Sequence, residues 1–141
     1  MTFKTYVLDS ICFLYHNFIM NWKIIFQENF DAEFDELNES VQDECYAHLK
    51  VLEKFGPELG RPHVDTLKGS KHSNMKELRF NADDGVWRLA FAFDPLRRAI
   101  LLICGDKSGG SEKRFYKDLI KKADQRFDKH LSNLKSEVHD D

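Results

Sequence analysis

Residues 75–93 read "MKELRFNADDGVWRLAFAF" and alternate between apolar and polar side chains on both sides of a short turn. Alternation with a period of two is typical of a strand that buries one face. The side that holds Lys76 also collects the large apolar residues of both segments, namely Leu78, Phe80, Trp87, Leu89, Phe91 and Phe93. Between the segments, "NADDG" predicts a turn, with Asp84-Gly85 as its strongest element. The sequence therefore predicts a hairpin of residues 75–80 and 86–93.

The other face of this hairpin carries Glu77 and Arg79 from the first strand and Arg88 from the second. A charged side chain within a core is costly, so we expect this face of the sheet to be open. Guanidinium groups bind phosphate oxygens in a bidentate manner and remain cationic at any relevant pH. The hairpin therefore predicts an anion-binding face, and a substitution of Arg88 is expected to leave the core untouched.

Upstream of the hairpin, residues 22–26 have the bulk of a short strand, and two helices are expected to follow it. Large apolar residues recur at spacings of four and three in the first helix: Phe26, Phe30, Phe34 and Leu37. Ser40 is the expected N-cap of the second helix, which ends at Gly56-Pro57. Residues 56–74 then read as a loop, and residues 1–19 precede the strand pattern and are expected to lie outside the fold.

Downstream of the hairpin, "AILLIC" at 99–104 is apolar on both sides, as expected for a central strand. After the loop "GDKSGG", Ser111 can cap a long helix. The predicted buried stripe of this helix is Phe115, Leu119, Ile120, Ala123, Phe127 and Leu131. Residues 134–141 form an acidic tail that is expected to fray. The order of strand, two helices, three meandering strands and a C-terminal helix predicts an α+β fold.

One domain fits the 141 residues, of which 42% are hydrophobic and 32% are charged. Three cysteines without a C-x-x-C pair suggest neither a disulfide framework nor a zinc site, and a reducing cytoplasm is the simplest compartment. No apolar run approaches the roughly 20 residues that cross a bilayer, so no membrane partner is expected. The net charge of −3 hides an asymmetry, since residues 27–60 hold ten acidic and two basic residues, whereas residues 61–117 hold seven acidic and twelve basic residues. A basic face is therefore possible on an acidic protein.

Several cations are expected near the open face: Arg79 and Arg88 on the sheet, Lys107 beyond the central strand, and Lys68, Lys71 and His72 on the loop before the hairpin. Such a face, with one acid or base and no metal ligands, fits metal-independent RNA cleavage, in which a ribose 2′-OH attacks the adjacent phosphate. Each residue also has a simpler interpretation. An arginine can pair with Glu77, Tyr116 can lie at the edge of a core, and the lysines and arginines that begin the last helix can form a solvated face.

Three stretches together carry a family resemblance: "LGRPHVDTLKGSKHSNMKELRF", "VWRLAFAFDPLRRAILLICGDKSG" and "RFYKDLIKKADQRFDKHL". They resemble the RelE/ParE superfamily of toxins, in the phage-derived, HigB-like branch of type II toxin–antitoxin systems. The resemblance covers about residues 20–133. It implies a domain in which an N-terminal helical hairpin packs on a small antiparallel sheet, with a C-terminal helix.

The resemblance also implies a function and a set of residues. RelE and HigB toxins cut mRNA on the ribosome without a cofactor and are neutralised by a cognate antitoxin, here expected to be a helix-turn-helix DNA-binding protein. The residues expected to take part in catalysis are Arg79, Arg88, Lys107, Tyr116 and Glu77. Glu77 stands where RelE itself has a lysine, so it is expected either to act as a base or to orient the arginines. The residues expected to bind RNA are Lys68, Lys71, His72, Lys76, Lys113 and Arg114.

Two other functions stay open at this point. A ParE-like toxin would inhibit DNA gyrase by binding it, without nuclease chemistry. A phage-derived relic would bind a partner and have no catalytic role. Only the nuclease needs both arginines and a proton-transfer residue on one face of the sheet, and the sequence supplies all of them.

Overall fold

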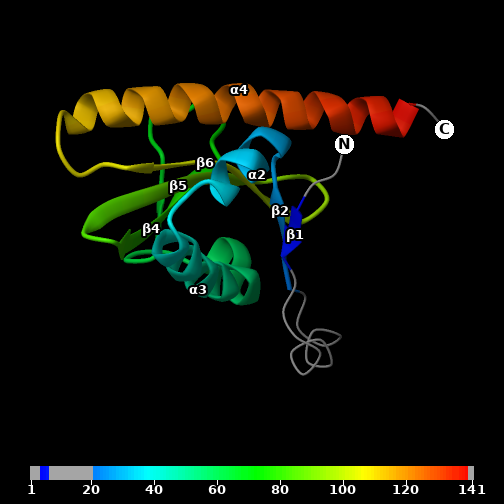
Figure 1. The fold of residues 1–141 in the computed structure, drawn as a ribbon. Coiled ribbons are helices and arrows are strands. Elements are labelled where there is room, and N and C mark those ends of the chain that lie inside the picture. Colours follow the sequence, from blue (N-terminus) through cyan, green and yellow to red (C-terminus); the bar gives the residue numbers. More distant parts are fainter. Residues whose placement is uncertain (1–3, 7–20, 140–141) are drawn as a thin grey trace.

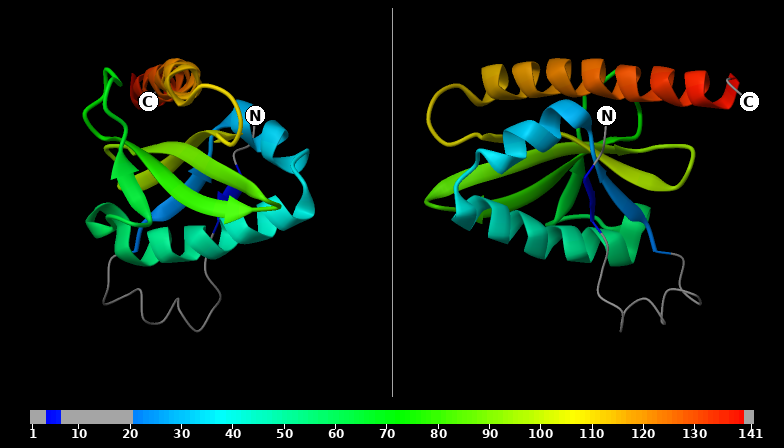
Figure 2. Two further views of the ribbon diagram at one scale, coloured as in Figure 1. Left: turned by 90° about the vertical axis from the view of Figure 1, so that its left-hand side faces the viewer. Right: turned by 45° about the vertical axis from the view of Figure 1, so that its right-hand side comes forward.

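The computed structural model describes residues 4–6 and 21–139, and side chains are described for residues 21–137. A six-stranded sheet lies between one long helix and two shorter helices (Figure 1). The strands follow the order β1 (Lys4–Tyr6), β2 (Lys23–Phe26), β6 (Arg98–Asp106), β5 (Gly85–Phe93), β4 (Met75–Ala82) and β3 (Val64–Thr66). The long helix α4 (Glu112–His139) covers one face of the sheet and α3 (Glu39–Phe55) covers the other (Figure 2). Helix α2 (Glu28–Asp35) runs beside the sheet between them and packs Phe30 and Phe34 into the core on the α3 side. A short 3-10 helix, η1 (Gly56–Glu58), follows α3. The predicted α+β class and the C-terminal helix are confirmed.

The predicted architecture needs two corrections. The helical hairpin of α2 and α3 is not N-terminal, because β1 and β2 precede it. The sheet is mixed, because β2 runs parallel to β6, with Ile24 opposite Ala99 and Ile25 opposite Ile100. A parallel pair needs a long connection, and here the segment between the two strands contains both helices and three other strands.

The ends of the chain also differ from the expectation. Lys4–Tyr6 pair with β2 in antiparallel fashion, so this part of the predicted extension 1–19 adds a strand to the sheet. The rest of that extension lies outside the described residues. At the other end α4 continues to His139, so the stretch 134–139 of the predicted tail is helical. The division of the chain at residues 20 and 133 stays a prediction.

The hairpin that the sequence predicts is confirmed as β4 and β5, with Arg79 directly opposite Arg88. Ala82 pairs with Gly85, and the two residues between them, Asp83 and Asp84, have φ angles of 50° and 59°. Two central residues with positive φ match the right-handed twist of the strands, so the turn begins one residue earlier than predicted. The register brings the two arginines side by side.

Two cores hold the layers together. Between the sheet and the α2–α3 pair lies an aromatic cluster whose fully buried members include Phe26, Phe30, Phe34 and Phe91. The Gln27 side chain caps α2 by accepting from the backbone of two residues in its first turn, whereas α3 begins after Asn38 and not after Ser40 as predicted. The second core lies under α4 and is built from the predicted apolar stripe of that helix, including Leu119, Ala123 and Phe127.

The second core explains why the charged face of the hairpin is not open. Met75, Ala90 and Ala92 lie on the same face as Arg88 and are buried in the core under α4. Small apolar residues on a sheet leave room for a helix to pack closely. The prediction of an open face is therefore wrong, because α4 covers it.

A buried polar cluster of Asp94, Arg98 and His130, here called the Asp94 cluster, also fixes α4 to the sheet. His130 Nε2 lies 3.0 Å from Asp94 Oδ2, and Arg98 Nε donates to the same oxygen at 2.9 Å. Burial alone would raise the pKa of Asp94, but the hydrogen bonds from His130 and Arg98 outweigh it and hold the pKa below its usual value. None of the described helices is long and apolar enough to span a membrane.

Candidate functional site

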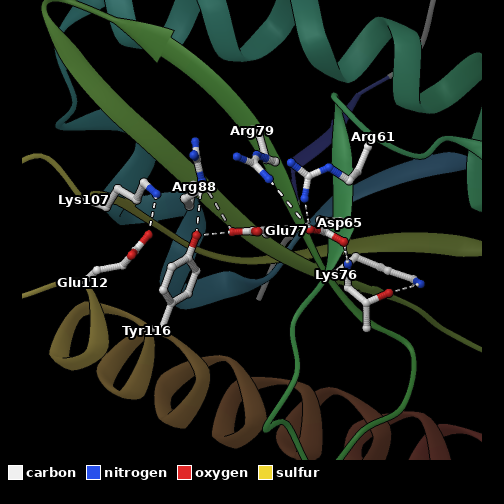
Figure 3. A network of polar contacts seen from close by, with 10 residues as sticks. Arg61, Asp65, Lys76, Glu77, Arg79, Arg88, Lys107, Glu112 and Tyr116 are labelled. Atoms are coloured by element: carbon white, nitrogen blue, oxygen red, sulfur yellow. Dashed lines mark hydrogen bonds and ion pairs between the residues drawn. The ribbon is translucent and has the colours of Figure 1, made fainter.

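Three predicted catalytic residues meet between the hairpin and the first turns of α4 (Figure 3). The Tyr116 hydroxyl donates to Glu77 Oε1 at 2.8 Å and accepts from Arg88 Nε at 3.3 Å. Arg88 Nε is also 3.5 Å from the same Glu77 oxygen. The hairpin sets the two charged residues on one face, and α4 brings the phenol over them. These three residues are called the Glu77–Tyr116–Arg88 triad.

The triad is largely shielded from solvent. Glu77 and Arg88 are each only 5% exposed, because α4 lies over them. A buried charge is tolerated when it is paired and hydrogen-bonded, and Arg88 Nη1 also donates to the Trp87 carbonyl at 2.9 Å. Removing the guanidinium would leave the Glu77 carboxylate buried without its cation. The expectation that a substitution of Arg88 leaves the fold untouched therefore loses its basis.

The protonation state of Tyr116 follows from its surroundings. Burial and the hydrogen bond to Glu77 raise the pKa of Tyr116 above its ordinary value of 10.0, against the opposing effect of Arg88. At neutral pH the phenol therefore keeps its proton and acts as a donor. It can take a proton from a substrate only if its own proton passes to Glu77, and the hydrogen bond to that carboxylate provides a route for such a transfer.

Arg79 lies beside the triad and is less buried than Arg88. Its guanidinium Nη1 is 3.7 Å from Asp65 Oδ2, and its side chain is 25% exposed. Arg61 Nη1 donates to the same Asp65 oxygen at 2.9 Å (Figure 3). Asp65 belongs to β3, so the edge strand supplies a carboxylate that two arginines share.

Lys107 reaches the triad from the end of β6. Its Nζ donates to Glu112 Oε1 at 2.7 Å and lies 5.8 Å from the centre of the Tyr116 ring. The hydrogen bond from Lys107 lowers the pKa of Glu112, and the charges of Arg88 and Arg79 add to this effect. Lys107, Arg88 and Arg79 therefore all favour a negative charge at the position of the Glu112 carboxylate.

The predicted RNA-binding residues divide into two groups. Lys68 and Lys113 line an open groove of about 440 Å³ that reaches Tyr116, and the other residues lining it are Gly69, Lys117, Ile120, Lys121 and Asp124. Arg114 lines a neighbouring hollow of about 500 Å³, which it shares with Lys113. Lys68 and Lys113 thus share a groove with Tyr116 of the triad, whereas Arg114 lies in the adjoining hollow.

The structure does not bring the other three to the site. Lys71 forms an ion pair with Asp128 on α4, and His72 Nε2 lies 2.8 Å from the same carboxylate. The His72 ring also packs edge-on against Phe127, with ring centres 4.9 Å apart. Lys76 points to the opposite face of β4, where its Nζ donates to the Thr66 hydroxyl at 2.9 Å. Their role in RNA binding stays a prediction, and these contacts give each of them a structural one.

Four residues near the site were not predicted. Lys117 and Lys121 line the groove, and a signal for them exists, because they continue the spacing of four that begins at Lys113. Asp65 and Glu112, which pair with the cations, gave no usable signal. Asp65 lies on an edge strand within the predicted loop 56–74, and Glu112 is the first residue of α4, where an acidic side chain is common in any helix. Among the residues that the structure describes, no group of three or more histidine, cysteine or acidic side chains could hold a metal ion.

Comparisons with known proteins agree with the resemblance in the sequence. Residues 32–128 match the family model of phage-derived Gp49-like proteins. The chain is 42% identical over 108 residues to a protein of Mycobacterium tuberculosis named as toxin HigB2, an alignment that covers 76% of this chain and 53% of the relative. It is 45% identical over 100 residues to another protein of that organism, named as toxin HigB3, with 71% of this chain and 85% of the relative covered.

The chain thus spans about half the length of the first relative and most of the second. No solved structure matches the chain. The family match covers more than half of the chain, and the second relative shares 45% identity over 85% of its own length. The chain therefore belongs to the family of phage-derived Gp49-like proteins, in its HigB-like branch.

Proposed function

We propose that this protein is the toxin of a toxin–antitoxin system and that it cleaves mRNA on the ribosome by 2′-OH attack, without need of a metal ion. The names of both relatives support the toxin assignment. The observation that carries the cleavage chemistry is the triad, in which a proton-transfer pair of Glu77 and Tyr116 is hydrogen-bonded to Arg88. Arg79 and Lys107 flank it on either side (Figure 3).

The roles of the residues follow from their chemistry and exposure. The ribose 2′-OH loses its proton to the Tyr116 oxygen while the Tyr116 proton passes to Glu77. The 2′ oxygen then bonds to phosphorus, the bond from phosphorus to the 5′ oxygen breaks, and the leaving oxygen takes a proton from Lys107. Arg79 and Arg88 stabilise the negative charge that builds on the phosphoryl oxygens. The products are a 2′,3′-cyclic phosphate and a 5′-hydroxyl.

The proposed partners are the ribosome with its mRNA and a cognate antitoxin. A helix-turn-helix, DNA-binding antitoxin is proposed from the family resemblance, since toxin–antitoxin complexes commonly repress their own operon. Co-expression with the neighbouring reading frame followed by affinity purification tests this partner. A toxin that binds no product of that frame would contradict the proposal.

One observation favours a second function. Glu77 and Arg88 are nearly as buried as core residues, and an ion pair in that position can serve the fold alone. A protein that stops growth by binding gyrase or another partner, without cleaving RNA, would have the same structure. The two functions differ in whether cut mRNA appears.

Primer extension on cellular mRNA after induction separates them, and Arg79→Ala is the informative variant. Arg79 is partly exposed and only distantly paired, so its removal should keep the fold. We expect cut ends with the wild type and about 10²-fold to 10³-fold less cleavage with Arg79→Ala. Arg61→Ala is the matched control, because Arg61 contacts the same Asp65 oxygen but is not in the proposed site. Growth arrest without cut mRNA, or equal cleavage by Arg79→Ala, would contradict the nuclease proposal.

A further inference from the structure

A row of lysines on α4 leads away from the triad. Lys113, Lys117 and Lys121 are spaced four residues apart and lie along the same side of the helix. Lys68, on the loop between β3 and β4, faces this row across the open groove of about 440 Å³. Tyr116 and Ile120, from the same helix, also line the groove. These six residues are called the lysine groove.

The four lysines of the groove are not neutralised by the protein. Among the described residues, none of their ammonium groups has an ion pair or a hydrogen bond. Two basic residues farther along α4, Arg126 and Lys129, do pair with acidic side chains of α2. Like charges at a spacing of four repel each other on a helix. What distinguishes the row is that its repelling charges line one groove, where an anion from outside the protein would relieve the repulsion.

The Asp124 carboxylate on α4 joins the two sides of the groove through hydrogen bonds to the loop. Asp124 lines the groove, and its Oδ1 accepts from the Ser70 hydroxyl at 2.5 Å while its Oδ2 accepts from the Lys71 backbone at 3.2 Å. These bonds hold the loop that carries Lys68 against α4. The one acidic residue that lines the groove therefore serves to anchor the loop, and the groove keeps a net positive charge of three from its lining residues.

We propose that the lysine groove binds the phosphodiester backbone of the RNA strand that is cleaved at the triad, on one side of the scissile phosphate. This inference rests on the proposed function. Four residues of α-helix rise about 6 Å, which is close to the separation of successive phosphates along an extended strand. Tyr116 belongs both to the groove and to the triad, so one strand can follow the lysines to the reacting phosphate. Because the proposed contacts are to phosphates and not to bases, the groove positions the strand without reading its sequence.

The test uses the intact protein and a fluorescent 12-nucleotide 2′-O-methyl oligouridine, which cannot undergo 2′-OH attack. Its Kd is measured by fluorescence anisotropy over a series of salt concentrations. Each lost phosphate contact should reduce the slope of log Kd against log salt by about 0.7 for a single strand. The triple variant Lys113→Gln, Lys117→Gln, Lys121→Gln should therefore lose about 2 from the slope. The corresponding triple substitution by arginine should keep it.

Lys135→Gln is the matched control, since it removes an exposed lysine from the same helix about 20 Å beyond the groove. A triple glutamine variant that keeps the wild-type slope would overturn the groove, even where the wild type binds and cuts RNA and the proposed function stands. The proposal would also be overturned if the triple glutamine variant bound the oligonucleotide as the wild type does but bound ribosomes without mRNA more weakly. The lysines would then contact ribosomal RNA. A wild type that neither binds the oligonucleotide nor cuts mRNA would overturn both the groove and the nuclease.

Discussion

The substitution Tyr116→Phe removes one hydroxyl from the triad and leaves the aromatic ring in place. The ring can still pack edge-on against Phe115, with ring centres 5.3 Å apart. The substitution removes two hydrogen bonds, of which the shorter joins the phenol to the Glu77 carboxylate and the longer joins it to Arg88 Nε. A hydrogen bond to a charged group contributes about 1.5–3 kcal/mol. Glu77 and Arg88 are already 3.5 Å apart and can close on each other, so we expect a loss near the lower limit, about 1.5 kcal/mol. For a chain of this size, such a loss lowers Tm by about 5 °C.

Cleavage should fall far more than stability does. A positioned acid or base contributes about 10²-fold to 10⁴-fold to a rate, which corresponds to about 3–5 kcal/mol of barrier. A domain with about 5–15 kcal/mol of stability stays almost wholly folded after losing 1.5 kcal/mol. The loss of cleavage therefore cannot come from unfolding. It would report the part that the Tyr116 hydroxyl plays in proton transfer.

The assays are thermal unfolding followed by circular dichroism and mRNA cleavage on programmed ribosomes. Tyr46→Phe is the control, because Tyr46 packs against Phe34 on the other side of the sheet, away from the triad. The raised pKa of Tyr116 adds a second readout. A group whose pKa is higher in the folded state contributes stability below its unfolded pKa of about 10 and loses it as the pH rises further. The stability difference between the wild type and Tyr116→Phe should therefore shrink in alkaline solution. A Tyr116→Phe protein that melts lower but cuts within threefold of the wild type would refute the catalytic role and leave the triad as a structural link to α4.

Three further predictions concern the fold. Asp84 has a φ of 59°, where glycine is favoured, so Asp84→Gly should raise the free energy of unfolding by about 0.5–1 kcal/mol in a urea titration; a decrease would contradict the left-handed turn. Gly56 has a φ of 57°, and an added Cβ would lie 2.2 Å from the Trp22 ring, so Gly56→Ala should lower the unfolding free energy by more than about 2 kcal/mol, unlike Gly60→Ala, whose Cβ meets no atom within 4 Å. The pKa of Asp94 is lowered in the folded state, so this group contributes stability above its unfolded pKa of about 4 and loses it as the pH falls. Asp94→Asn should therefore be less stable than the wild type at pH 7 and should lose less stability on acidification. Melting curves from pH 2 to 7 that show the same acid response for both proteins would contradict this role of the Asp94 cluster.

The parts of the fold that the sequence predicted are those set by local periodicity. The β4–β5 hairpin, the central position of β6, the buried phenylalanines of α2 and the apolar stripe of α4 all follow from spacings of two, three or four residues. The same periodicity put Glu77, Arg79 and Arg88 on one face, and the register confirms it. A short-range pattern is sufficient for these features, because neighbours in the sequence define them.

The features that the sequence did not predict depend on contacts between distant segments. The parallel pairing of β2 with β6 joins strands that lie far apart in the chain, and local periodicity does not report such a pairing. The edge strand β3 pairs with the next strand, β4, but its three residues are too few to show a periodic signal. The cover of α4 over the hairpin was also not predicted. A signal for it exists in Ala90 and Ala92, because two small apolar residues on a face are a reason to expect a helix packed there. That covered face is also why Tyr116 meets Glu77 and Arg88 in a shielded site.

The exposure of each ion pair decides which cations are free to hold a phosphate. Arg88 is held between Glu77 and Tyr116 under α4, and breaking a buried ion pair is costly. Arg88 can therefore stabilise a phosphate only from its present position, while it stays paired with Glu77. Lys107 pairs with the exposed carboxylate of Glu112, and Arg79 pairs at 3.7 Å with the half-buried Asp65. Ion pairs of this kind contribute little to stability, so an incoming phosphate can replace the carboxylate without disturbing the fold. Among the described residues, the chain thus supplies one fixed cation at the triad, two flanking cations that can exchange partners, and a row of lysines without partners along the groove proposed for the RNA.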